Sequence, residues 1–159
     1  ENGMDLQPAI DAGLLRVICR YAEAMSLEDL LVDLRVELEE LNPSLIVLDS
    51  ISSIEHSSSE KGFRQFMIGV AAILREHGRT ALLTQTVTAH HAPETSPYLS
   101  TIGDAILALD YSTESYSLNR EMRVIKTRGS SHEASPYRLS IEPGGLVVKK
   151  MTPEQVERR

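Results

Sequence analysis

The sequence predicts an α/β fold: a mainly parallel sheet flanked by helices, with an antiparallel edge near the C-terminus. Three observations lead to this prediction. Short apolar runs alternate with stretches of helical periodicity up to about residue 111, an order typical of parallel sheets with helical crossovers. The run Leu45–Leu48 is continuously apolar and precedes Asp49, which indicates a strand buried on both faces and ending in an acid. Beyond residue 116 the segments shorten, and Pro143-Gly144-Gly145 predicts a hairpin turn.

Local signals define the boundaries of the elements. Ser26 offers a hydroxyl N-cap with acidic residues in the turn that follows, and Asn42-Pro43 stops the same helix. Gly78 is suited to end a second amphipathic helix, whereas the serine-rich segment 50–61 is expected to be a loop. In chain order, the expected elements are a short helix near 6–12, a strand at 14–21, a helix from 27 to about 41, a strand at 45–50, a helix at 63–77, and strands at 80–85, 102–111, 116–127, 137–141 and 146–149.

Composition limits the classes of function. The chain has 159 residues, which favours one domain at 1–150, followed by a polar tail at 151–159. Its net charge of −7 disfavours a protein that follows a nucleic-acid backbone. Cys19 is the single cysteine, and no apolar run is long enough to span a bilayer. We therefore expect a cytoplasmic protein without a nucleic-acid or membrane partner.

Asp49 is the first candidate for chemistry. In open parallel sheets, ligands bind beyond the carboxyl ends of the strands, and an acid at that place is suited to organise magnesium. Thr84 and Gln85 end the next expected strand, and adjacent strand ends lie about 5 Å apart, so this pair is placed to sense a γ-phosphate. Another interpretation remains open, in which Asp49 caps the next helix and the pair marks an ordinary strand-to-loop transition.

The segment Lys126–Ser130 is the strongest basic feature. On a strand, Lys126 and Arg128 point to the same side, and two cations followed by glycine and serine suit contact with phosphates. Arg120 and Arg123 add positive charge nearby. An equally open interpretation is a solvated edge strand whose charges discourage aggregation.

Adjacent hydroxyls at Ser100 and Thr101 precede the fourth apolar run. From the residues alone, a helix N-cap pair is favoured over a pair of phosphoacceptors. The sequence also lacks the phosphate-binding pattern G-x-x-x-x-G-K-[ST]. That loop belongs to the first βα unit of a fold of this kind, so the chain is expected to begin after that unit.

Taken together, these motifs resemble the KaiC family of RecA-like ATPases, over nearly the whole chain to about Gly145. The apolar-Asp-Ser ending of Leu45–Ser50 is shared widely among RecA relatives. More specific are F-R-Q-F-x-I-G-V at 63–70, S-T-I-x-D at 100–104 and K-x-R-G-S-x-H at 126–132. The resemblance implies a RecA-like fold without its P-loop βα unit, and a hexameric ring with ATP held between subunits.

The same resemblance implies roles for single residues. Asp49 would be the Walker B acid that organises Mg²⁺. Lys126 and Arg128 would be finger residues that reach the γ-phosphate of ATP held by a neighbouring subunit. The other implied nucleotide contacts are Arg120 toward phosphate, Thr127 within the basic segment, and Gly129, Ser130 and His132 by the ribose and base. The implied phosphoacceptors are Ser100 and Thr101, with Thr95 as a nearby third hydroxyl.

Two hypotheses of different class follow. The first is a hexameric ATPase or autokinase in signalling or circadian timing, of which this chain is the C-terminal part of one ATPase domain. Because the Walker A loop and the water-activating glutamates of the family would lie upstream, the chain alone is not expected to hydrolyse ATP. The second is a nucleotide-free module that uses the same scaffold to bind a signalling protein. The negative charge disfavours a third class, a recombinase-like DNA-binding ATPase.

Overall fold

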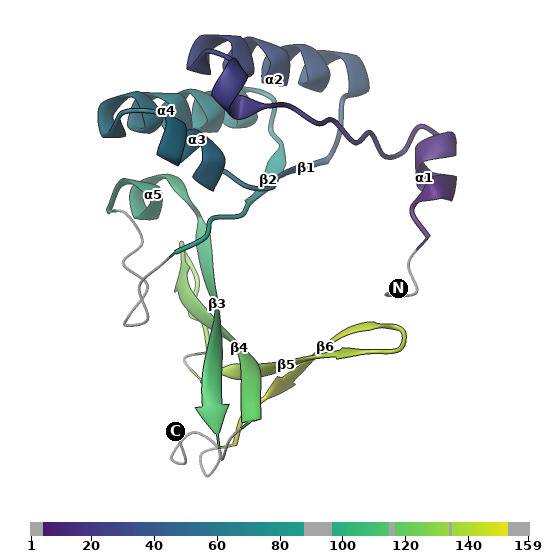
Figure 1. Cartoon of the computed structure of the whole chain (residues 1–159), viewed down its shortest axis with the longest axis vertical. Coiled ribbons are helices and arrows are strands. Elements are labelled where there is room, and N and C mark those ends of the chain that lie inside the picture. The colour runs from purple at the N-terminus through teal and green to yellow at the C-terminus, as the bar shows by residue number, and fades with distance from the viewer. Residues whose placement is uncertain (1–4, 88–96, 115–116, 134, 153–159) are drawn as a thin grey trace. The chain divides into compact units, whose positions relative to one another are not determined.

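The computed structural model describes residues 5–87, 97–114, 117–133 and 135–152. The chain divides into two compact units (Figure 1). One unit is Cys19–Ile102, and the other combines Glu1–Ile18 with Gly103–Arg159. Each unit has its own secondary structure.

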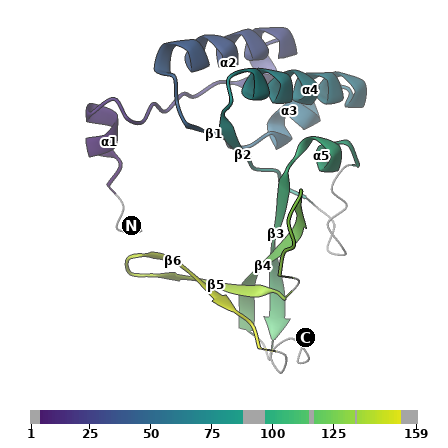
Figure 2. The same cartoon turned by 180° about the vertical axis from the view of Figure 1, so that it is seen from behind.

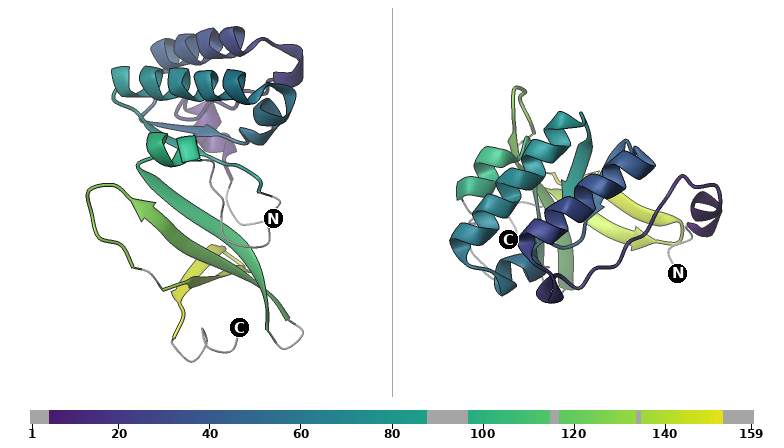
Figure 3. Two further views of the ribbon diagram at one scale, coloured as in Figure 1. Left: turned by 90° about the vertical axis from the view of Figure 1, so that its left-hand side faces the viewer. Right: turned by 90° about the horizontal axis from the view of Figure 1, so that it is seen from above.

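The Cys19–Ile102 unit places helices on a pair of parallel strands. Its elements are η1 (Ala22–Ala24), α2 (Leu27–Leu41), β1 (Leu45–Leu48), α3 (Ser52–Ser57), α4 (Glu60–Glu76), β2 (Thr80–Leu83) and α5 (Pro97–Ile102). Helices α2 and α4 run side by side over one face of the strands (Figures 1 and 3). Among the described residues, no helix combines the length and the apolar character needed to cross a membrane.

Side-chain and backbone caps explain where α2 and α4 begin and end. The hydroxyl oxygens of Ser26 and Ser59 each accept the backbone N–H three residues ahead, at 3.1 Å. Asn42 ends α2 in the left-handed region at φ 50°, and Gly78 follows α4 at φ 62°. The predicted N-cap at Ser26 and the predicted stop of α2 at Asn42 are confirmed. The C-cap of α4 is His77 with the predicted Gly78 directly after it, and the Ser59 cap starts α4 slightly earlier than predicted.

The core of this unit lies between α2, α4 and the sheet. Its buried apolar residues are Leu38, Ile51, Phe63, Phe66, Met67, Val70, Ile73 and Leu74, six of them on α4 at helical spacing. Gly69 lets α2 approach closely, because a Cβ at this position would lie 2.8 Å from Cδ1 of Leu31. The ring of Phe63 meets Tyr98 of α5 edge-on, with centroids 5.9 Å apart.

The parallel pair is covered on one face only. Strands β1 and β2 pair in register from Leu45 opposite Thr80 onward. Ile46 and Leu48 pack against the core, whereas Leu45 and Val47 remain 55% and 52% exposed. The prediction that this run is buried on both faces is therefore wrong for this chain, because the described helices cover only the face that carries Ile46 and Leu48.

The segment 50–61 is not the loop that its serine content predicts. Residues Ser52–Ser57 form α3, and α4 already begins at Glu60. Ile51 is only 2% exposed and anchors the start of α3 in the core. Ser58 Oγ donates to the carbonyl of Ile54 at 2.7 Å, which closes the end of the helix. Burial of one apolar side chain thus outweighs the weak helix propensity of serine.

The second unit is organised around a four-stranded antiparallel sheet (Figure 2). Its elements are α1 (Gln7–Asp11), β3 (Ala105–Glu114), β4 (Ser117–Thr127), β5 (Tyr137–Glu142) and β6 (Gly145–Lys150), with the sheet order β3-β4-β5-β6. The predicted hairpin is confirmed, since Pro143-Gly144 forms the turn between β5 and β6, and Gly144 and Gly145 have φ 119° and 131°. The short N-terminal helix with Pro8 in its first turn is also confirmed.

Strand β3 is predicted as a further strand of the parallel sheet, and the structure differs. It pairs antiparallel with β4, from Ala105 opposite Thr127 to Glu114 opposite Ser117, with a bulge beside Ile106. Consecutive strands joined by a short connection pair antiparallel, because a parallel partner needs a long crossover. The antiparallel part of the fold is therefore larger than the sequence predicts.

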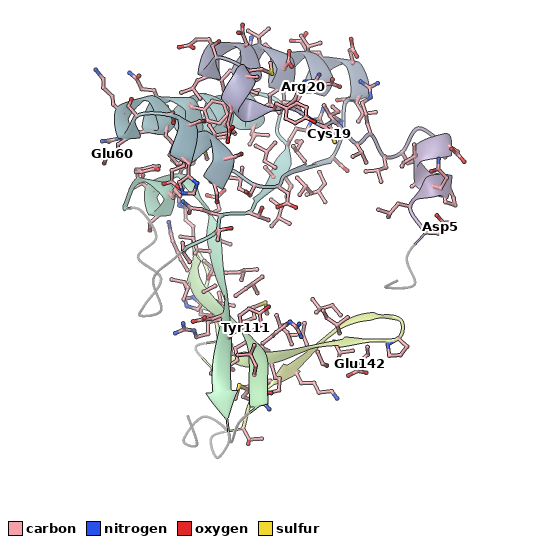
Figure 4. All side chains as sticks on the ribbon, in the orientation of Figure 1. Asp5, Cys19, Arg20, Glu60, Tyr111 and Glu142 are labelled. Atoms are coloured by element: carbon pink, nitrogen blue, oxygen red, sulfur yellow. The ribbon has the colours of Figure 1, made fainter. Side chains whose placement is uncertain are left out.

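The strand predicted at 14–21 is absent, and these residues form neither helix nor strand. Leu14 is 83% exposed, so the apolar run does not mark a core position. Arg20, labelled in Figure 4, ties the end of the segment to α2: its Nε donates to Oδ2 of Asp33 at 2.8 Å, and its Nη2 lies 3.7 Å from Oε1 of Glu37. The hydrogen bond with Asp33 raises the pKa of Arg20.

Candidate functional site

The carboxyl ends of β1 and β2 bring Asp49 and Thr84 together, as the sequence predicts. Because the strands are parallel and in register, both residues follow their strands at the same edge. Thr84 Oγ1 donates to Oδ1 of Asp49 at 2.5 Å. The backbone N–H of Thr84 donates to the carbonyl of Leu48 at 3.1 Å, and the N–H of Ile51 donates to the carbonyl of Thr84 at 2.9 Å. The Asp49–Thr84 pair is thus held by backbone bonds on either side.

Helix α3 adds two more links at this edge. Gln85 Nε2 donates to Oε2 of Glu55 at 2.7 Å, and the backbone N–H of Thr86 donates to Oγ of Ser52 at 2.8 Å. Sequence reasoning missed Glu55 and Ser52, because it expected a loop here. Their spacing of three residues places them on one side of a helix, and that signal becomes informative only once α3 is recognised.

The chemistry of this edge suits a hard cation with a mostly hydrated shell. Asp49 is exposed and carries a carboxylate, the type of ligand that Mg²⁺ prefers while it keeps several waters. The described residues contain no group of three or more His, Cys, Asp or Glu side chains that could hold a metal between them. Magnesium sites commonly use one or two protein carboxylates together with waters and substrate phosphates, and the carboxylate of Asp49 fits such a site.

The basic segment lies at the end of β4 in the other unit. Lys126 Nζ donates to the carbonyl of Gly103 at 3.0 Å, and the backbone N–H of Arg128 donates to the carbonyl of Asp104 at 2.7 Å. Arg128 Nη1 also lies 3.1 Å from Oδ1 of Asp104. Both cations therefore meet the same turn at Gly103-Asp104. Strand β4 pairs with β3 up to Thr127, but its pairing with β5 covers only Arg120–Met122. Among the described strands, the end of β4 that carries Lys126 is therefore paired on one side only, and its interpretation as a solvated edge stays open.

Thr127 organises the turn that follows. Its Oγ1 donates to the carbonyl of Ser130 at 3.0 Å and lies 3.2 Å from Nδ1 of His132. A hydroxyl has one hydrogen, so a bond to both requires His132 to donate from Nδ1. Gly129 has φ 75°, a conformation that favours glycine. Gly129, Ser130 and His132 are exposed, which leaves this turn accessible to a ligand.

Arg120 is not brought beside the basic turn. Its guanidinium stacks over the ring of Tyr111, 5.7 Å from the centroid. It precedes Lys126 by six positions on β4, and a strand rises about 3.4 Å per residue, so the two lie about 20 Å apart along the strand. One phosphate group cannot contact both side chains within one subunit.

The adjacent hydroxyls at Ser100 and Thr101 lie in the last turn of α5, so the N-cap interpretation is wrong. Thr101 Oγ1 donates to the carbonyl of Tyr98 at 2.7 Å, and Thr101 is exposed. Thr95, the third expected hydroxyl, lies outside the described residues.

Comparison with known proteins decides the family. Residues 1–153 match the family model of the KaiC ATPase. The chain belongs to the KaiC family. Its KaiC relatives include the circadian clock oscillator proteins KaiC of Picosynechococcus sp. and of Acaryochloris marina, which are 34% and 35% identical to it over 92% of this chain. The circadian clock protein KaiC3 of Synechocystis sp. is 32% identical over 93% of it.

The chain spans less than a third of the length of these KaiC relatives: 29%, 28% and 30%, respectively. Its small parallel sheet and its four-stranded antiparallel sheet are consistent with a portion of a RecA-like fold. The predicted family and fold class are therefore confirmed.

Proposed function

We propose that this chain is the C-terminal part of a KaiC-type ATPase domain, which acts in a cytoplasmic hexameric ring in signalling or circadian timing. The Thr84–Asp49 hydrogen bond at the ends of two parallel strands supports this most directly, because it orients an exposed carboxylate where α/β nucleotide sites lie. A chain of the KaiC family is expected to use that edge for ATP. The phosphate-binding loop of the site is proposed to lie in a part of the full-length gene product that this chain does not span.

Asp49 would organise Mg²⁺ bound to the ATP of its own subunit. The ion would neutralise charge on the β- and γ-phosphates. The hydroxyl of Thr84 donates to the carboxylate of Asp49 and so orients it, and two backbone hydrogen bonds hold Thr84. A group that is oriented before the ligand arrives has less conformational freedom to lose on binding.

Lys126 and Arg128 would contact the γ-phosphate of ATP held by the neighbouring subunit. Arg128 and its partner Asp104 are 47% and 77% exposed, so water screens their ion pair and it contributes little to stability. An incoming phosphate can therefore replace Asp104 at small cost, with the planar guanidinium suited to bidentate contact. Thr127 would shape the turn so that Gly129 presents backbone to the nucleotide. The remaining proposed contacts with the nucleotide are made by Ser130 and His132. Arg120 would contact a different part of the nucleotide.

Ser100 and Thr101, with Thr95, are the proposed phosphoacceptors of an autokinase activity. The relatives bear the name of circadian clock proteins, and Thr101 is exposed on a short helix. A phosphopeptide map of the full-length gene product incubated with ATP tests this part separately, and a map without phosphate at the three positions removes it.

Substitution of Arg128 by alanine in the full-length gene product tests the role between subunits. We expect nucleotide-dependent ring assembly and ATP hydrolysis to be lost, because the cation reaches across the interface. Arg35→Ala is the matched control, since Arg35 also pairs with an exposed carboxylate, Glu76, at 2.8 Å. Sedimentation with and without ATP, together with the rate of ADP formation, gives the readout. Wild-type assembly and hydrolysis in Arg128→Ala would show that the basic turn has another purpose.

A second candidate is a nucleotide-free module that binds a signalling protein. The uncovered face of the parallel pair favours it: Leu45, Val47 and Leu82 are each about half exposed, and exposed apolar patches often mark interaction sites. Equilibrium binding of ATP to the full-length gene product separates the two candidates. Absence of binding in the presence of Mg²⁺ would favour the module over the ATPase.

A further inference from the structure

Glu55 and Gln85 form a contact that no role proposed so far uses. Gln85 Nε2 donates to Oε2 of Glu55 at 2.7 Å, and both side chains are half-buried. Gln85 directly follows Thr84, whose hydroxyl binds Asp49. The contact therefore lies at the same strand ends as the proposed magnesium site.

Helix α3 is fixed against this edge by contacts that do not involve Glu55. The backbone N–H of Ile51 donates to the carbonyl of Thr84 at 2.9 Å, and Ser52 Oγ accepts the N–H of Thr86 at 2.8 Å. Ile51 and Ser52 are both buried. Glu55 lies one turn after Ile51, so the helix sets its position. The hydrogen bond with Gln85 is not needed to place the carboxylate of Glu55.

The chemistry of the pair determines which way the glutamine amide faces. An ionised carboxylate only accepts hydrogen bonds, so the NH₂ group of Gln85 must face Glu55. The carbonyl oxygen Oε1 then faces away from it. The negative charge of Glu55 beside Nε2 also disfavours a phosphate oxygen at that nitrogen, since like charges repel strongly where water is partly excluded.

We propose that Glu55 is a positioning residue that fixes the amide of Gln85, so that Oε1 accepts a hydrogen bond from the water attacking the γ-phosphate. This inference rests on the proposed ATPase function. In that reaction the water oxygen bonds to the γ-phosphorus, and the bond from this phosphorus to the bridging oxygen of ADP breaks. One hydrogen of the water stays on inorganic phosphate and the other leaves as a solvent proton. Gln85 orients the water and takes no proton itself.

A double-mutant cycle in the full-length gene product tests whether Glu55 acts through Gln85. We expect Glu55→Ala and Gln85→Ala each to lower kcat about tenfold, the order expected for loss of a hydrogen bond to a charged group. The double variant should be no slower than Gln85→Ala, because residues that act as a unit are non-additive. KM for ATP should stay within about twofold, since no ground-state contact with ATP is removed. Independent effects, with the double variant about a hundredfold slower, would overturn the inference.

Exchange of the two side chains separates an acceptor from a donor at position 85. In Glu55→Gln/Gln85→Glu the amide now donates to a carboxylate at 85, which keeps an acceptor for water and leaves the total charge unchanged. We expect kcat to recover to within about threefold of the wild type, whereas Glu55→Gln alone, whose amide can face either way, stays lower. If position 85 donates to a phosphate, the exchanged protein stays slow and its KM rises, which refutes the proposal.

The controls separate this inference from the function on which it rests. Glu39→Ala removes an exposed glutamate from α2 and should leave kcat and KM unchanged. Circular dichroism and thermal unfolding show whether each variant folds, and Glu55→Gln replaces Glu55→Ala in the cycle if the alanine variant does not. A wild-type protein that neither binds nor hydrolyses ATP overturns the proposed function and this inference together. Hydrolysis by the wild type with an additive cycle overturns this inference alone.

Discussion

Replacement of Thr84 by valine tests whether the hydroxyl of Thr84 orients the carboxylate of Asp49 for binding of magnesium. Valine has the shape of threonine without the hydroxyl, so it removes the 2.5 Å bond to Asp49 and keeps the two backbone bonds of Thr84. A hydrogen bond to a charged acceptor contributes about 1.5–3 kcal/mol. Because Asp49 is exposed, water replaces the lost donor, and we expect the free energy of unfolding to fall by only about 1 kcal/mol. Urea unfolding of the chain measures this change.

The same substitution should affect magnesium more than stability. Loss of a residue that orients a metal ligand typically costs 10–100-fold in affinity, and the exposure of Asp49 places our expectation at about tenfold. Titration of Mg²⁺ into the full-length gene product, followed by binding of a fluorescent ATP analogue, gives the apparent affinity. Thr84→Ser keeps the hydroxyl and should behave like the wild type.

Thr80→Val is the matched control, because it makes the same change at the exposed first residue of β2. An equal loss of magnesium affinity in Thr80→Val would mean that the strand, and not the hydroxyl at 84, sets the affinity. Wild-type affinity in Thr84→Val would likewise refute the view that Thr84 prepares Asp49 for the ion.

Two further predictions concern stability. Phe63→Ala removes a ring that is 1% exposed and packs on Tyr98, and we expect the free energy of unfolding in urea to fall by about 3–5 kcal/mol, with a smaller loss in Phe63→Leu. The hydrogen bond from Lys150, with those from Ser135, lowers the pKa of Glu133 from 4.5 to about 2. Ionised Glu133 therefore stabilises the fold above about pH 4.5, and this contribution is lost as the pH falls toward 2. Glu133→Gln should remove that part of the pH dependence of Tm, and high salt should weaken it, because the pair is exposed.

The helices were predictable because their signals are local. Ser26 and Asn42 cap α2 through contacts within a few residues, and Gly78 ends α4 through its own backbone conformation. Such contacts join residues that are close in sequence, so they form independently of how distant parts of the chain pack. The pairing of Asp49 with Thr84 was predictable for a related reason, since two parallel strands in register must end at the same edge.

The wrong predictions concern segments whose secondary structure depends on packing against residues distant in sequence. The segment 14–21 has the composition of a strand, but a strand requires a partner edge, and composition does not say whether one exists. The alternation of strands and helices predicts β3 in the parallel sheet, although an apolar run does not indicate which strand pairs with it. Helix α3 was missed because the buried side chain of Ile51 outweighs the serines around it. Glu55 was missed for the same reason, because the direction of a side chain cannot be predicted for a residue expected to lie in a loop.

The two sets of candidate ATP contacts depend on different parts of the chain. Asp49 meets Thr84 across 35 positions, and Glu55 meets Gln85 across 30, so both contacts exist only while β1 and β2 are paired beneath α4. Lys126 and Arg128 instead depend on the turn at Gly103-Asp104 and on the β3–β4 pairing, in the other unit. We therefore expect a mutation in the α4 core to weaken the proposed magnesium contacts of Asp49 more than the contacts of Lys126 and Arg128 with Gly103-Asp104. For that reason, loss of activity after a core substitution does not by itself identify a catalytic residue, and the matched variants at 55, 84 and 85 carry more information.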